Sequence, residues 1–330
     1  DTTVKGFKTI FDEMRGSLEE LMKNAGDTTV KSQFIGYTRN LTTYFNEMAG
    51  NLTKMQEDVN SEIRIKVDEI SSLNKQINVI ELTGVIANEL RDQRTVIIDK
   101  LSKVIDVEVT ETPIYDTNNP ERFTGAHRCI VRVAGGQMVD MNEYNRLHCV
   151  AREADEKAYQ SDAVGLYDIE WENGAAFGMY NATMGGELAG LIHLRDGNNG
   201  EHFNGEISAL RRDNDGYDYV TIKVKDDYLL DMKKSTLASE GIINLGDTLF
   251  KYEGWSFDPE SKTYTFKLSQ EENGQQVPYS KMHREASVNQ SVAFKGIPYY
   301  NQQMNEWIRL FAQAVNEILT QPNSSARMAR

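Results

Sequence analysis

The feature that most constrains the fold is an apolar stripe that runs through residues 30–80 at spacings of three and four, with no proline inside it. Its members are Val30, Phe34, Tyr37, Leu41, Tyr44, Met48, Leu52, Met55, Val59, Ile63, Val67, Ile70, Leu73, Ile77 and Ile80. This spacing places the side chains on one face of an α-helix. At about 1.5 Å of rise per residue the stretch predicts a rod of about 80 Å, and so long a helix is typical of a coiled coil or an elongated bundle.

Shorter helices are predicted on both sides of this rod. Residues 4–21 carry a second stripe, made of Val4, Phe7, Phe11, Met14, Leu18 and Leu21. Gly26 predicts the end of that helix, and Asp27 or Thr28 predicts the N-cap of the next one. After the rod, a turn at Gly84 leads to a helix that ends near Ile105. Its inward-facing residues are predicted to be Leu90, Ile97, Leu101 and Val104.

The period of the sequence changes to two after residue 105. Val107 and Val109 alternate with acidic residues, which is typical of a strand. Residues 106–183 are therefore predicted to form short strands among turns, and residues 197–295 return to the same β character. Four pairs are predicted to close hairpins: Gly135-Gly136, Asn173-Gly174, Asp215-Gly216 and Asp258-Pro259.

Two further helices are predicted between and after the β regions. In "MGGELAGLIHLRDG" the paired glycines predict a tight entry turn and not a phosphate loop, which needs a lysine followed by Ser or Thr. The helix after them places four residues on one face: Leu188, Leu191, Ile192 and Arg195. The last stripe is made of Tyr300, Met304, Trp307, Phe311, Ala314 and Ile318.

The fold class that follows is α+β multidomain, an elongated and discontinuous long-helix bundle with inserted β-rich domains. We expect the apolar face at Leu188 to dock on the rod, and the last helix to pack on the long N-terminal helices. The predicted domains are a helical domain of residues 1–105 completed by 184–196 and 296–330, a β-rich domain of residues 106–183, and an additional β-rich insertion domain of residues 197–295.

Composition argues against several classes of partner. The formal net charge is −14 and the pI is about 4.9, which opposes binding to the phosphates of nucleic acid and to an anionic membrane. No apolar run approaches the roughly 18 residues that span a bilayer, and the N-terminus lacks the layout of a cleaved secretory signal. Because the chain starts at Asp1 without a methionine, we expect it to be a piece of a longer protein.

No catalytic, cofactor-binding or metal-ligating residues are predicted. None of the histidines has the H-x-x-x-H spacing of a zinc site: His127, His148, His193, His202 and His283. The segment Asp213 to Asp218 clusters carboxylates, but Val224 stands where an EF-hand needs glutamate, so a polar hairpin turn is favoured over adventitious Ca²⁺ binding. No Gly-x-Ser-x-Gly elbow occurs. We therefore predict that the chain is not an enzyme.

Two alternatives stay open. Cys129 and Cys149 are favoured as small buried apolar residues, with a disulfide between neighbouring strands as the other possibility. In residues 197–295 the aromatic rings of Trp255, Tyr217 and Tyr219 are favoured as core residues, but such rings also stack on sugars. The alternative function is therefore that this outward-facing region is a ligand- or glycan-binding, adhesin-like module.

The segment "ANELRDQRTVIIDKLS" is close to the pattern (N/D)-x-L-x-D-Q-R-x-x-L-L-D-x-L-S, and "ISSLNKQI" before it follows I-x-x-L-N-x-Q-I. Taken in this order, the two motifs resemble those of the flagellar hook-associated protein 1 family. "GGELAGLIHLRD" matches Gly-Gly-Glu-Leu-x-Gly-Leu-x-x-x-Arg-Asp. The Pro-x-Tyr helix that follows in the family is similar to "IPYYNQQMNEWIRLFAQAVNEI". That helix begins about 100 residues late here, so residues 197–295 are an addition to the family pattern.

The resemblance implies a structural component of the bacterial flagellum, assembled from subunits at the junction between hook and filament and needed for motility. It implies contacts with the hook protein, with the second hook–filament junction protein and with copies of itself in a ring. It also implies an export chaperone, which would bind a C-terminal segment missing from this sequence, and secretion to the extracellular flagellum. The terminal segments typical of such axial proteins are expected to be missing at both ends.

Overall fold

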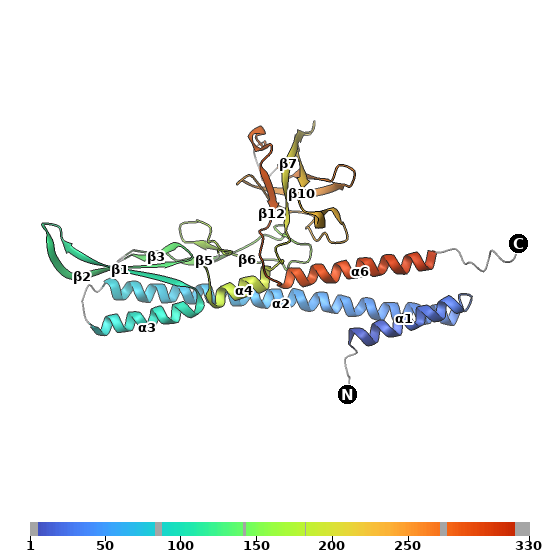
Figure 1. Ribbon diagram of the computed structural model, residues 1–330, viewed down its shortest axis with the longest axis horizontal. Helices are drawn as coiled ribbons and strands as arrows, with labels where there is room; N and C mark the ends of the chain where they lie inside the picture. The colour runs from blue at the N-terminus through green and yellow to red at the C-terminus, as the bar shows by residue number, and fades with distance from the viewer. Residues whose placement is uncertain (1–5, 83–87, 141–142, 182, 271–275, 321–330) are drawn as a thin grey trace. The chain divides into compact units, whose positions relative to one another are not determined.

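A computed structural model describes residues 6–82, 88–140, 143–181, 183–270 and 276–320 of the chain. The chain divides into two compact units, residues 1–55 and 56–330. Long helices stand at both ends of the described sequence and β-rich regions stand between them, which confirms the predicted α+β class (Figure 1). The predicted turn at Gly84 and the predicted apolar residue Val4 lie outside the described residues.

The helices of the described residues are α1 (Phe7–Lys23), α2 (Thr28–Leu82), α3 (Asn88–Val104), α4 (Gly186–Asp196) and α6 (Ile297–Thr320). The single long helix predicted through residues 30–80 is confirmed, because α2 runs without a break over 55 residues. The prediction that α3 ends near residue 105 is also confirmed. Two short 3₁₀ turns accompany them: η1 (Asp227–Leu230) and η2 (Tyr279–Lys281).

In the first unit α1 packs against the start of α2. The Phe7 ring lies 6.1 Å from the Tyr44 ring and 5.9 Å from the Phe45 ring. The buried residues of this pair are Ile10, Met14, Leu18, Phe34 and Leu41. The predicted stripe is thus confirmed at Met14 and Leu18, but Ile10 is buried where Phe7 was expected, since Phe7 is 36% exposed.

Of the two predicted N-cap candidates, Asp27 is the N-cap of α2 and Thr28 is the first residue of the helix. The Asp27 Oδ1 accepts hydrogen bonds from the backbone N–H groups of Thr29, at 2.7 Å, and Val30, at 3.4 Å. These bonds satisfy donors that the first helical turn leaves without a partner. They also lower the pKa of the Asp27 carboxyl below its ordinary value.

The second half of α2 belongs to the second unit and carries its main apolar stripe. The buried members are Val59, Ile63, Val67, Ile70, Leu73 and Ile77. Met55 was predicted on the same buried face but is 47% exposed. Four amide side chains are buried on this half of the helix: Gln56, Asn60, Asn74 and Asn78. The stripe is therefore partly polar, which the apolar spacing alone did not indicate.

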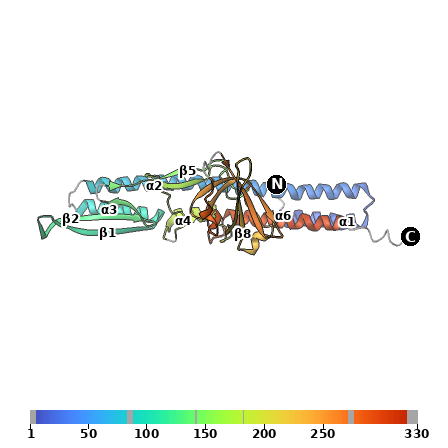
Figure 2. The ribbon, with the colours of Figure 1, turned by 90° about the horizontal axis from the view of Figure 1, so that it is seen from above.

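The strands that follow α3 form two small antiparallel sheets. One has the order β1-β2-β3-β4, with β1 (Val107–Asp116), β2 (Asn119–Val133), β3 (Gly136–Asp140) and β4 (Glu143–Tyr144). The other pairs β5 (Leu147–Ala151) with β6 (Tyr167–Trp171). The expectation of short strands is wrong for β1 and β2, which pair along most of their length (Figure 2). Residues 110–126 contain few apolar residues, so no alternation of apolar and polar side chains indicated a long strand there.

The predicted hairpin between β2 and β3 forms, but its turn lies one residue earlier than expected. Ala134 and Gly135 have positive φ angles of 47° and 79°, as the favoured two-residue hairpin turn requires. Gly136 instead starts β3, where a Cβ would lie 2.3 Å from the ring of Trp171. The second glycine is thus required by packing and not by the turn.

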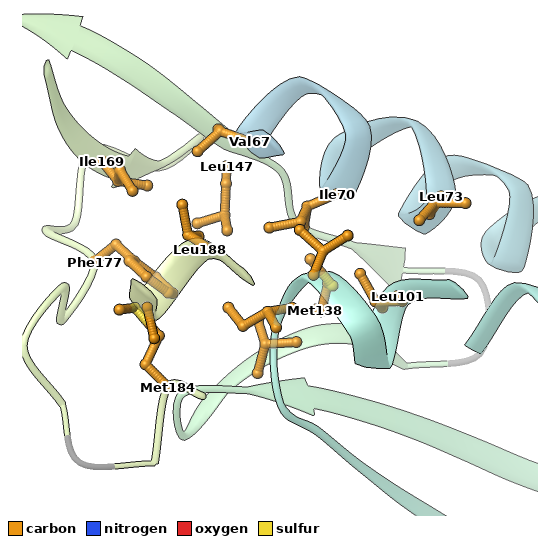
Figure 3. Close-up of a cluster of buried hydrophobic side chains, with 14 of the residues drawn as sticks. Val67, Ile70, Leu73, Leu101, Met138, Leu147, Ile169, Phe177, Met184 and Leu188 are labelled. Carbon is orange, nitrogen blue, oxygen red and sulfur yellow. The ribbon is translucent and has the colours of Figure 1, made fainter. Parts of the chain in front are cut away.

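The core of the second unit is shared by helices and strands (Figure 3). Its side chains include Val67, Ile70, Leu73, Leu101, Met138, Leu147, Ile169, Phe177, Met184 and Leu188. Leu188 and Ile192 are fully buried in this core, and Leu191 packs at its edge, as the helical face of α4 predicted. Burying one such side chain stabilises the fold by about 1.5–3 kcal/mol.

Residues 203–288 contain a closed six-stranded barrel with the strand order β10-β11-β8-β7-β12-β9. Its strands are β7 (Phe203–Arg212), β8 (Asp218–Val224), β9 (Gly241–Leu245), β10 (Leu249–Asp258), β11 (Thr263–Leu268) and β12 (Glu285–Val288). The two hairpins predicted here are confirmed, because β7 pairs with β8 and β10 with β11. The closure of these hairpins into a barrel by β9 and β12 was not predicted.

The first turns of α6 are buried on a different face from the predicted stripe. Ile297, Pro298, Asn301 and Gln302 are buried, whereas Tyr300 is 53% exposed. The reason is local, since the Gln302 Nε2 donates to Glu201 Oε2 at 2.6 Å, on the segment that leads into β7. The packing of α6 on the N-terminal helices stays a prediction.

Candidate functional site

A buried guanidinium lies at the C-terminal end of α4. The Arg195 side chain is 0% exposed. Its Nε and Nη2 donate to the Asp196 carboxylate at 2.8 and 2.7 Å, and its Nη1 donates to Asn60 Oδ1 at 2.9 Å and to the Tyr167 carbonyl at 2.7 Å. Nη2 also lies 4.0 Å from the Met179 sulfur. All three guanidinium nitrogens thus have acceptors, which is what a buried arginine needs to be tolerated.

Asp196 completes this ion pair. Its carboxylate is 4% exposed and also accepts a hydrogen bond from the Tyr180 hydroxyl at 3.0 Å. Burial raises the pKa of this carboxyl, but the charge and hydrogen bonds of Arg195 outweigh burial, so the pKa lies below its ordinary value. The pKa of Arg195 is raised, because Asp196 outweighs the lowering effect of burial. Both groups are therefore charged in the folded protein at neutral pH.

A second ion pair lies beside the first. The Arg152 Nη2 donates to Asp168 Oδ1 at 2.6 Å, and its Nε lies 3.0 Å from Asp168 Oδ2. Burial lowers the pKa of Arg152, but these hydrogen bonds raise it more, so the net pKa is raised. Bidentate pairs of this kind fix the orientation of both side chains. The pair joins β6 to the segment after β5.

The amide side chains of α2 hold the β segments that run beside the helix. The Gln56 Oε1 accepts the backbone N–H of Ala163 at 2.8 Å, and the Asn60 Oδ1 accepts that of Tyr167 at 2.8 Å. Further along, the Ser71 Oγ donates to the Leu147 carbonyl at 2.6 Å. Asn74 contacts the Asn145 carbonyl in the same way. These hydrogen bonds from side chains of α2 fix the position of residues 145–167 along the helix.

A narrow neck connects α4, the barrel and α6. The Gly296 N–H donates to the Gly197 carbonyl at 3.0 Å, and the Gly197 N–H donates to the His193 carbonyl at 2.9 Å. A Cβ on Gly197 would lie 2.7 Å from the Gly296 nitrogen, and a Cβ on Gly296 would lie 2.4 Å from the His193 carbonyl oxygen. Glycine is therefore required at both positions by the close approach of the two chain segments. The chain enters and leaves the barrel at one point.

Asn198 fixes the neck from the barrel side. This residue is 1% exposed, and its Nδ2 donates to the Tyr159 hydroxyl at 2.7 Å and to the Gln290 carbonyl at 2.8 Å. Its Oδ1 accepts the backbone N–H groups of Val292, at 2.9 Å, and Gly200, at 3.0 Å. One buried amide thus joins both strands of the neck to the segment that contains Tyr159.

That segment is in turn bonded to α2 and to the barrel. The Asp162 carboxylate accepts the Tyr159 N–H at 2.9 Å and the Gln56 Nε2 at 3.1 Å, and burial raises the pKa of this carboxyl. On the barrel side, the Gln160 N–H donates to the Thr236 carbonyl at 2.8 Å. A chain of hydrogen bonds therefore runs from the long helix through Asp162 to the barrel. We call residues 155–163 the clasp.

We call the contacts of Arg152, Arg195, Gln56, Asn60 and the clasp the polar joint. Its two arginines are paired with Asp168 and Asp196. The Asp162 carboxylate is held by hydrogen bonds from Tyr159 and Gln56. Hydrogen-bonded buried networks rigidify a fold when every member is satisfied. The joint fixes how the clasp, the helix and the barrel meet inside the second unit.

The structure brings none of the histidines together. The His283 Nδ1 lies 2.9 Å from Glu206 Oε1, His193 stacks on Phe294, and His127 lies 3.1 Å from Arg91 Nη2. Within the described ranges, no group of three or more His, Cys, Asp or Glu side chains is placed to hold a metal ion. The Asp213 segment is a polar hairpin turn, as favoured, because the Asp213 Oδ1 accepts two backbone N–H groups of that turn.

Cys129 and Cys149 are not joined by a disulfide, so the disulfide alternative is wrong. Cys129 lies in β2 and is fully buried, whereas Cys149 lies in β5, in the other sheet. Burial raises the pKa of the Cys149 thiol to about 11. None of the helices in the described part of the chain has the length and apolar character that crossing a membrane requires.

The aromatic residues proposed for sugar stacking are engaged by protein groups. The Trp255 Nε1 donates to the Ala238 carbonyl at 2.8 Å. The Lys267 ammonium lies 3.7 Å from the centre of the Tyr217 ring, and the Arg211 guanidinium lies 4.3 Å from that of the Tyr219 ring. Trp255 packs against the barrel core, as favoured. Tyr217 and Tyr219 are half-buried and contact Lys267 and Arg211, so the expectation that they are core residues is not met.

Sequence reasoning missed the polar part of the joint. Arg195 was placed on the buried face of α4, but its charge was not predicted to be paired inside the core. The amides of α2 were not predicted at all, although Gln56, Asn60 and Asn74 fall on the same helical face as Ile63 and Val67. Asparagine and glutamine repeated within an apolar stripe were the available signal.

Comparison with known proteins gives consistent results. The family described as the flagellar hook-associated protein FlgK helical domain matches residues 1–210. The chain is 30% identical over 117 residues to flagellar hook-associated protein 1 of Bacillus subtilis, which covers 33% of this chain and 23% of that protein. It is 30% identical over 118 residues to the Escherichia coli protein of the same name, covering 33% and 22%. The matched stretch thus spans about a quarter of these curated relatives.

One solved structure is similar over most of the chain. It is that of the flagellar hook junction protein FlgK from Burkholderia pseudomallei, with a TM-score of 0.52 and 15% sequence identity. The likeness covers 89% of this chain and 58% of that chain. At this identity the likeness concerns the fold.

Proposed function

We propose, because this chain belongs to the flagellar hook-associated protein FlgK helical-domain family, that it is a structural subunit of the junction between hook and filament in the bacterial flagellum. The family match over residues 1–210 is the observation that carries this proposal. The polar joint supports it, since a subunit that transmits load needs fixed relations between its parts. The role is one of assembly and not of catalysis.

The partners follow from that role. We propose contacts with the hook protein, with the second hook–filament junction protein and with copies of this chain in a ring. An export chaperone acts before assembly, and the assembled protein is extracellular. These assignments rest on the family and on the names of the relatives, one of which is a flagellar hook junction protein. The net charge of −14 opposes contacts with nucleic acid and with anionic membranes, so we propose neither as a partner.

For the architecture we propose a helical domain of residues 1–105 completed by 184–196 and 296–330, a β-rich domain of residues 106–183, and an insertion of residues 197–295. The neck at Gly197 and Gly296 supports the insertion, because both of its ends meet there. We do not propose the adhesin-like function, since Trp255, Tyr217 and Tyr219 already contact groups of the protein.

Deletion and complementation test the junction role. A strain that lacks this protein is expected to keep its hooks, to grow no filaments and to release unassembled filament protein into the medium. The natural gene restores filaments and swimming, and antibody against the barrel labels the hook end of isolated flagella. Normal filaments in the deletion strain would refute the proposal.

The matched control is a variant with Gly254→Ala, because a Cβ added at Gly254 would meet open space and the residue lies away from the neck. This variant is expected to support filament growth as well as the natural protein does. Gly296→Ala, which places a Cβ 2.4 Å from the His193 carbonyl oxygen, is expected to reduce the amount of folded protein and of filaments. Equal behaviour of the two variants would contradict the role given to the neck.

A further inference from the structure

The polar joint contains one carboxylate more than it has arginines. Arg152 makes a bidentate pair with Asp168, and Arg195 makes a bidentate pair with Asp196. Asp162 is the third carboxylate and is 6% exposed. In the part of the chain that the structure describes, no lysine or arginine lies within ion-pair distance of it. Its negative charge, when present, is therefore buried without a cation of its own, which is costly.

The two hydrogen bonds of the Asp162 carboxylate come from neutral groups. Its Oδ2 accepts the Tyr159 N–H at 2.9 Å, and its Oδ1 accepts the Gln56 Nε2 at 3.1 Å. Burial raises the pKa of this carboxyl, and the two hydrogen bonds and the charge of Arg152 lower it by less, so the pKa lies above its ordinary value. Asp162 therefore keeps its proton to a higher pH than an exposed aspartate does.

The groups that face Asp162 come from each element packed against it. The segment after β5 contributes the Arg152 guanidinium, whose charge opposes protonation of Asp162, and α4 contributes the Asp196 carboxylate, whose charge favours it. Asp196 is already ionised, because its own pKa is lowered. Burial raises the pKa of the Tyr159 hydroxyl in the clasp, so this group is neutral at neutral pH. The Gln56 amide, from α2, carries no charge. Asp162 is therefore the group of this set that gains a charge as the pH rises above the ordinary pKa of aspartate.

Asp162 also closes the turn through which the clasp contacts its neighbours. The Asp162 N–H donates to the Tyr159 carbonyl at 3.0 Å, while the carboxylate accepts the Tyr159 N–H. Tyr159 forms an antiparallel bridge with Leu237, in the segment before β9 of the barrel. On the other side, the Ala163 N–H donates to the Gln56 Oε1 of α2 at 2.8 Å. One short turn thus contacts both the long helix and the barrel, and both ends of this turn are bonded to Asp162.

We propose that Asp162 is a proton-binding site that makes the clasp a pH-dependent latch between α2 and the barrel. With the proton bound, the carboxyl group is neutral and stays buried, and the clasp is closed on both elements. When the proton leaves to the solvent, the carboxylate has a buried charge without a cation, so an open clasp in which it reaches water becomes more favourable. The latch is a property of the fold of this chain and does not rest on the proposed assembly function.

Linkage gives the direction of the effect. Because the folded pKa of Asp162 is raised, the closed clasp is most stable below the unfolded pKa of about 4 and loses stability as the pH rises through the folded pKa. Asp196 acts in the opposite direction, because its lowered pKa stabilises the fold above its unfolded pKa. Two carboxylates of one joint thus respond to pH with opposite signs, and an experiment can separate them.

Hydrogen exchange of the purified full chain, followed by mass spectrometry, tests the latch. The reporters are the N–H groups of Gln160, Ala163 and Ala238, which donate to the barrel, to α2 and to the clasp, respectively. Their protection, corrected with the exchange rates of the unfolded chain, is expected to fall at least about tenfold between about pH 4 and about pH 8, which corresponds to a pKa raised by one unit or more. The N–H groups of Gly197 and Gly296 at the neck are the internal reference, and their protection is expected to stay constant.

Asp162→Asn removes the titrating group. In this variant the protection of the clasp is expected to be independent of pH, whatever its absolute value. The matched control is Asp155→Asn, which makes the same change in the same segment. Asp155 pairs with Lys251 at 2.7 Å, and the hydrogen bond from Lys251 lowers its pKa, so its loss removes no group that titrates like Asp162. Asp155→Asn is therefore expected to keep the fall in protection.

A second measurement needs no variant. In carbon-13 spectra of the natural chain labelled at its aspartate carboxyl carbons, one signal is expected to titrate with a midpoint well above the ordinary aspartate pKa of about 3.9. This measurement decides the proposal even where Asp162→Asn does not fold, because spectra without such a signal would overturn the proton-binding site.

Three exchange results would also overturn the latch. They are constant clasp protection across the pH range in the natural chain, the same pH-dependent loss in Asp162→Asn, and an equal loss of protection at the neck. None of them bears on the junction role, which is tested separately by filament growth in the deletion strain. The expected result is a fall in protection that is confined to the clasp and its contacts and that requires Asp162.

Discussion

Replacing Arg195 by leucine tests whether the buried ion pair holds the joint together. The change removes the cation hydrogen-bonded to Asp196, which is 4% exposed and would keep a hydrogen bond from the Tyr180 hydroxyl. It also removes the Nη1 donor of the Tyr167 carbonyl. Removing one partner of a buried ion pair costs about 3–5 kcal/mol, because the other charge stays buried without compensation. We expect Arg195→Leu to lower the free energy of unfolding of the second unit by about that amount.

The matched control is Arg212→Leu. Arg212 also makes a bidentate pair, with Asp218, but its side chain is 41% exposed. Solvent screens such a pair, so its loss is expected to cost less than about 1 kcal/mol. The two variants thus remove the same side chain and differ in burial.

Urea unfolding followed by tryptophan fluorescence measures the difference. Trp255→Phe and Trp307→Phe are included in every variant, so that the signal comes from Trp171, which is 8% exposed and lies in the same apolar core as α4. The free energy is read from the transition of this probe, because a chain of two units need not unfold in one step. Equal losses for Arg195→Leu and Arg212→Leu, or a loss below about 1 kcal/mol for the former, would refute the reasoning.

Three further outcomes are expected. The folded protein lowers the pKa of Asp196, so the stability that this carboxylate contributes is present above its unfolded pKa and is lost as the pH falls. In Arg195→Leu burial acts without the cation and raises the pKa of Asp196. The difference in unfolding free energy between the natural protein and Arg195→Leu should therefore become smaller from pH 7 to about pH 4, as measured by unfolding curves. Gly186→Ala should lower the free energy of unfolding by more than about 2 kcal/mol, because Gly186 has a φ of 72° and an added Cβ would lie 2.5 Å from the Val104 carbonyl oxygen. In the control Gly190→Ala the added Cβ meets open space, so this change should leave the free energy of unfolding unchanged or raise it by up to about 1 kcal/mol. Cys149, whose pKa is about 11, should react with a thiol reagent at about pH 8 more than a hundredfold more slowly than in the unfolded chain, and equal rates would contradict its burial.

Apolar spacing predicted the long helix because one energy term dominates there. A single stripe of three- and four-residue steps has one structural solution, and α2 begins where Asp27 caps it. The same reasoning located α4 and its buried face at Leu188. In these segments burial of apolar surface and local propensity point to the same answer, which is the condition under which sequence patterns are reliable.

The length of the β1–β2 hairpin and the closure of the barrel were missed for a different reason. Strand pairing between segments distant in sequence has no local signature, so the pairing of β12 with β7 and β9 could not be derived from residues 285–288 alone. In residues 113–126 the large apolar side chains are few and do not alternate regularly with polar ones, so the sequence pattern there does not define a strand face. The polar joint was missed because amides in a helix are usually solvated, and burial of Gln56 and Asn60 depends on partners more than 100 residues away.

The neck explains why an insertion of this size is compatible with the helical frame. The Tyr299 N–H donates to the Gly197 carbonyl and the Tyr300 N–H donates to the Gly296 carbonyl, so the start of α6 is bonded directly to the point where α4 ends. These hydrogen bonds join backbone groups, so the only side-chain requirement is glycine at positions 197 and 296. The end of α4 and the start of α6 therefore stay in direct contact although the barrel is inserted between them in the sequence. Its orientation is then set separately, by Asn198 and by the clasp, which bond it to α2 through Asp162. It follows that the neck determines where the barrel is attached, and the buried side chains determine the direction in which the attached barrel is held.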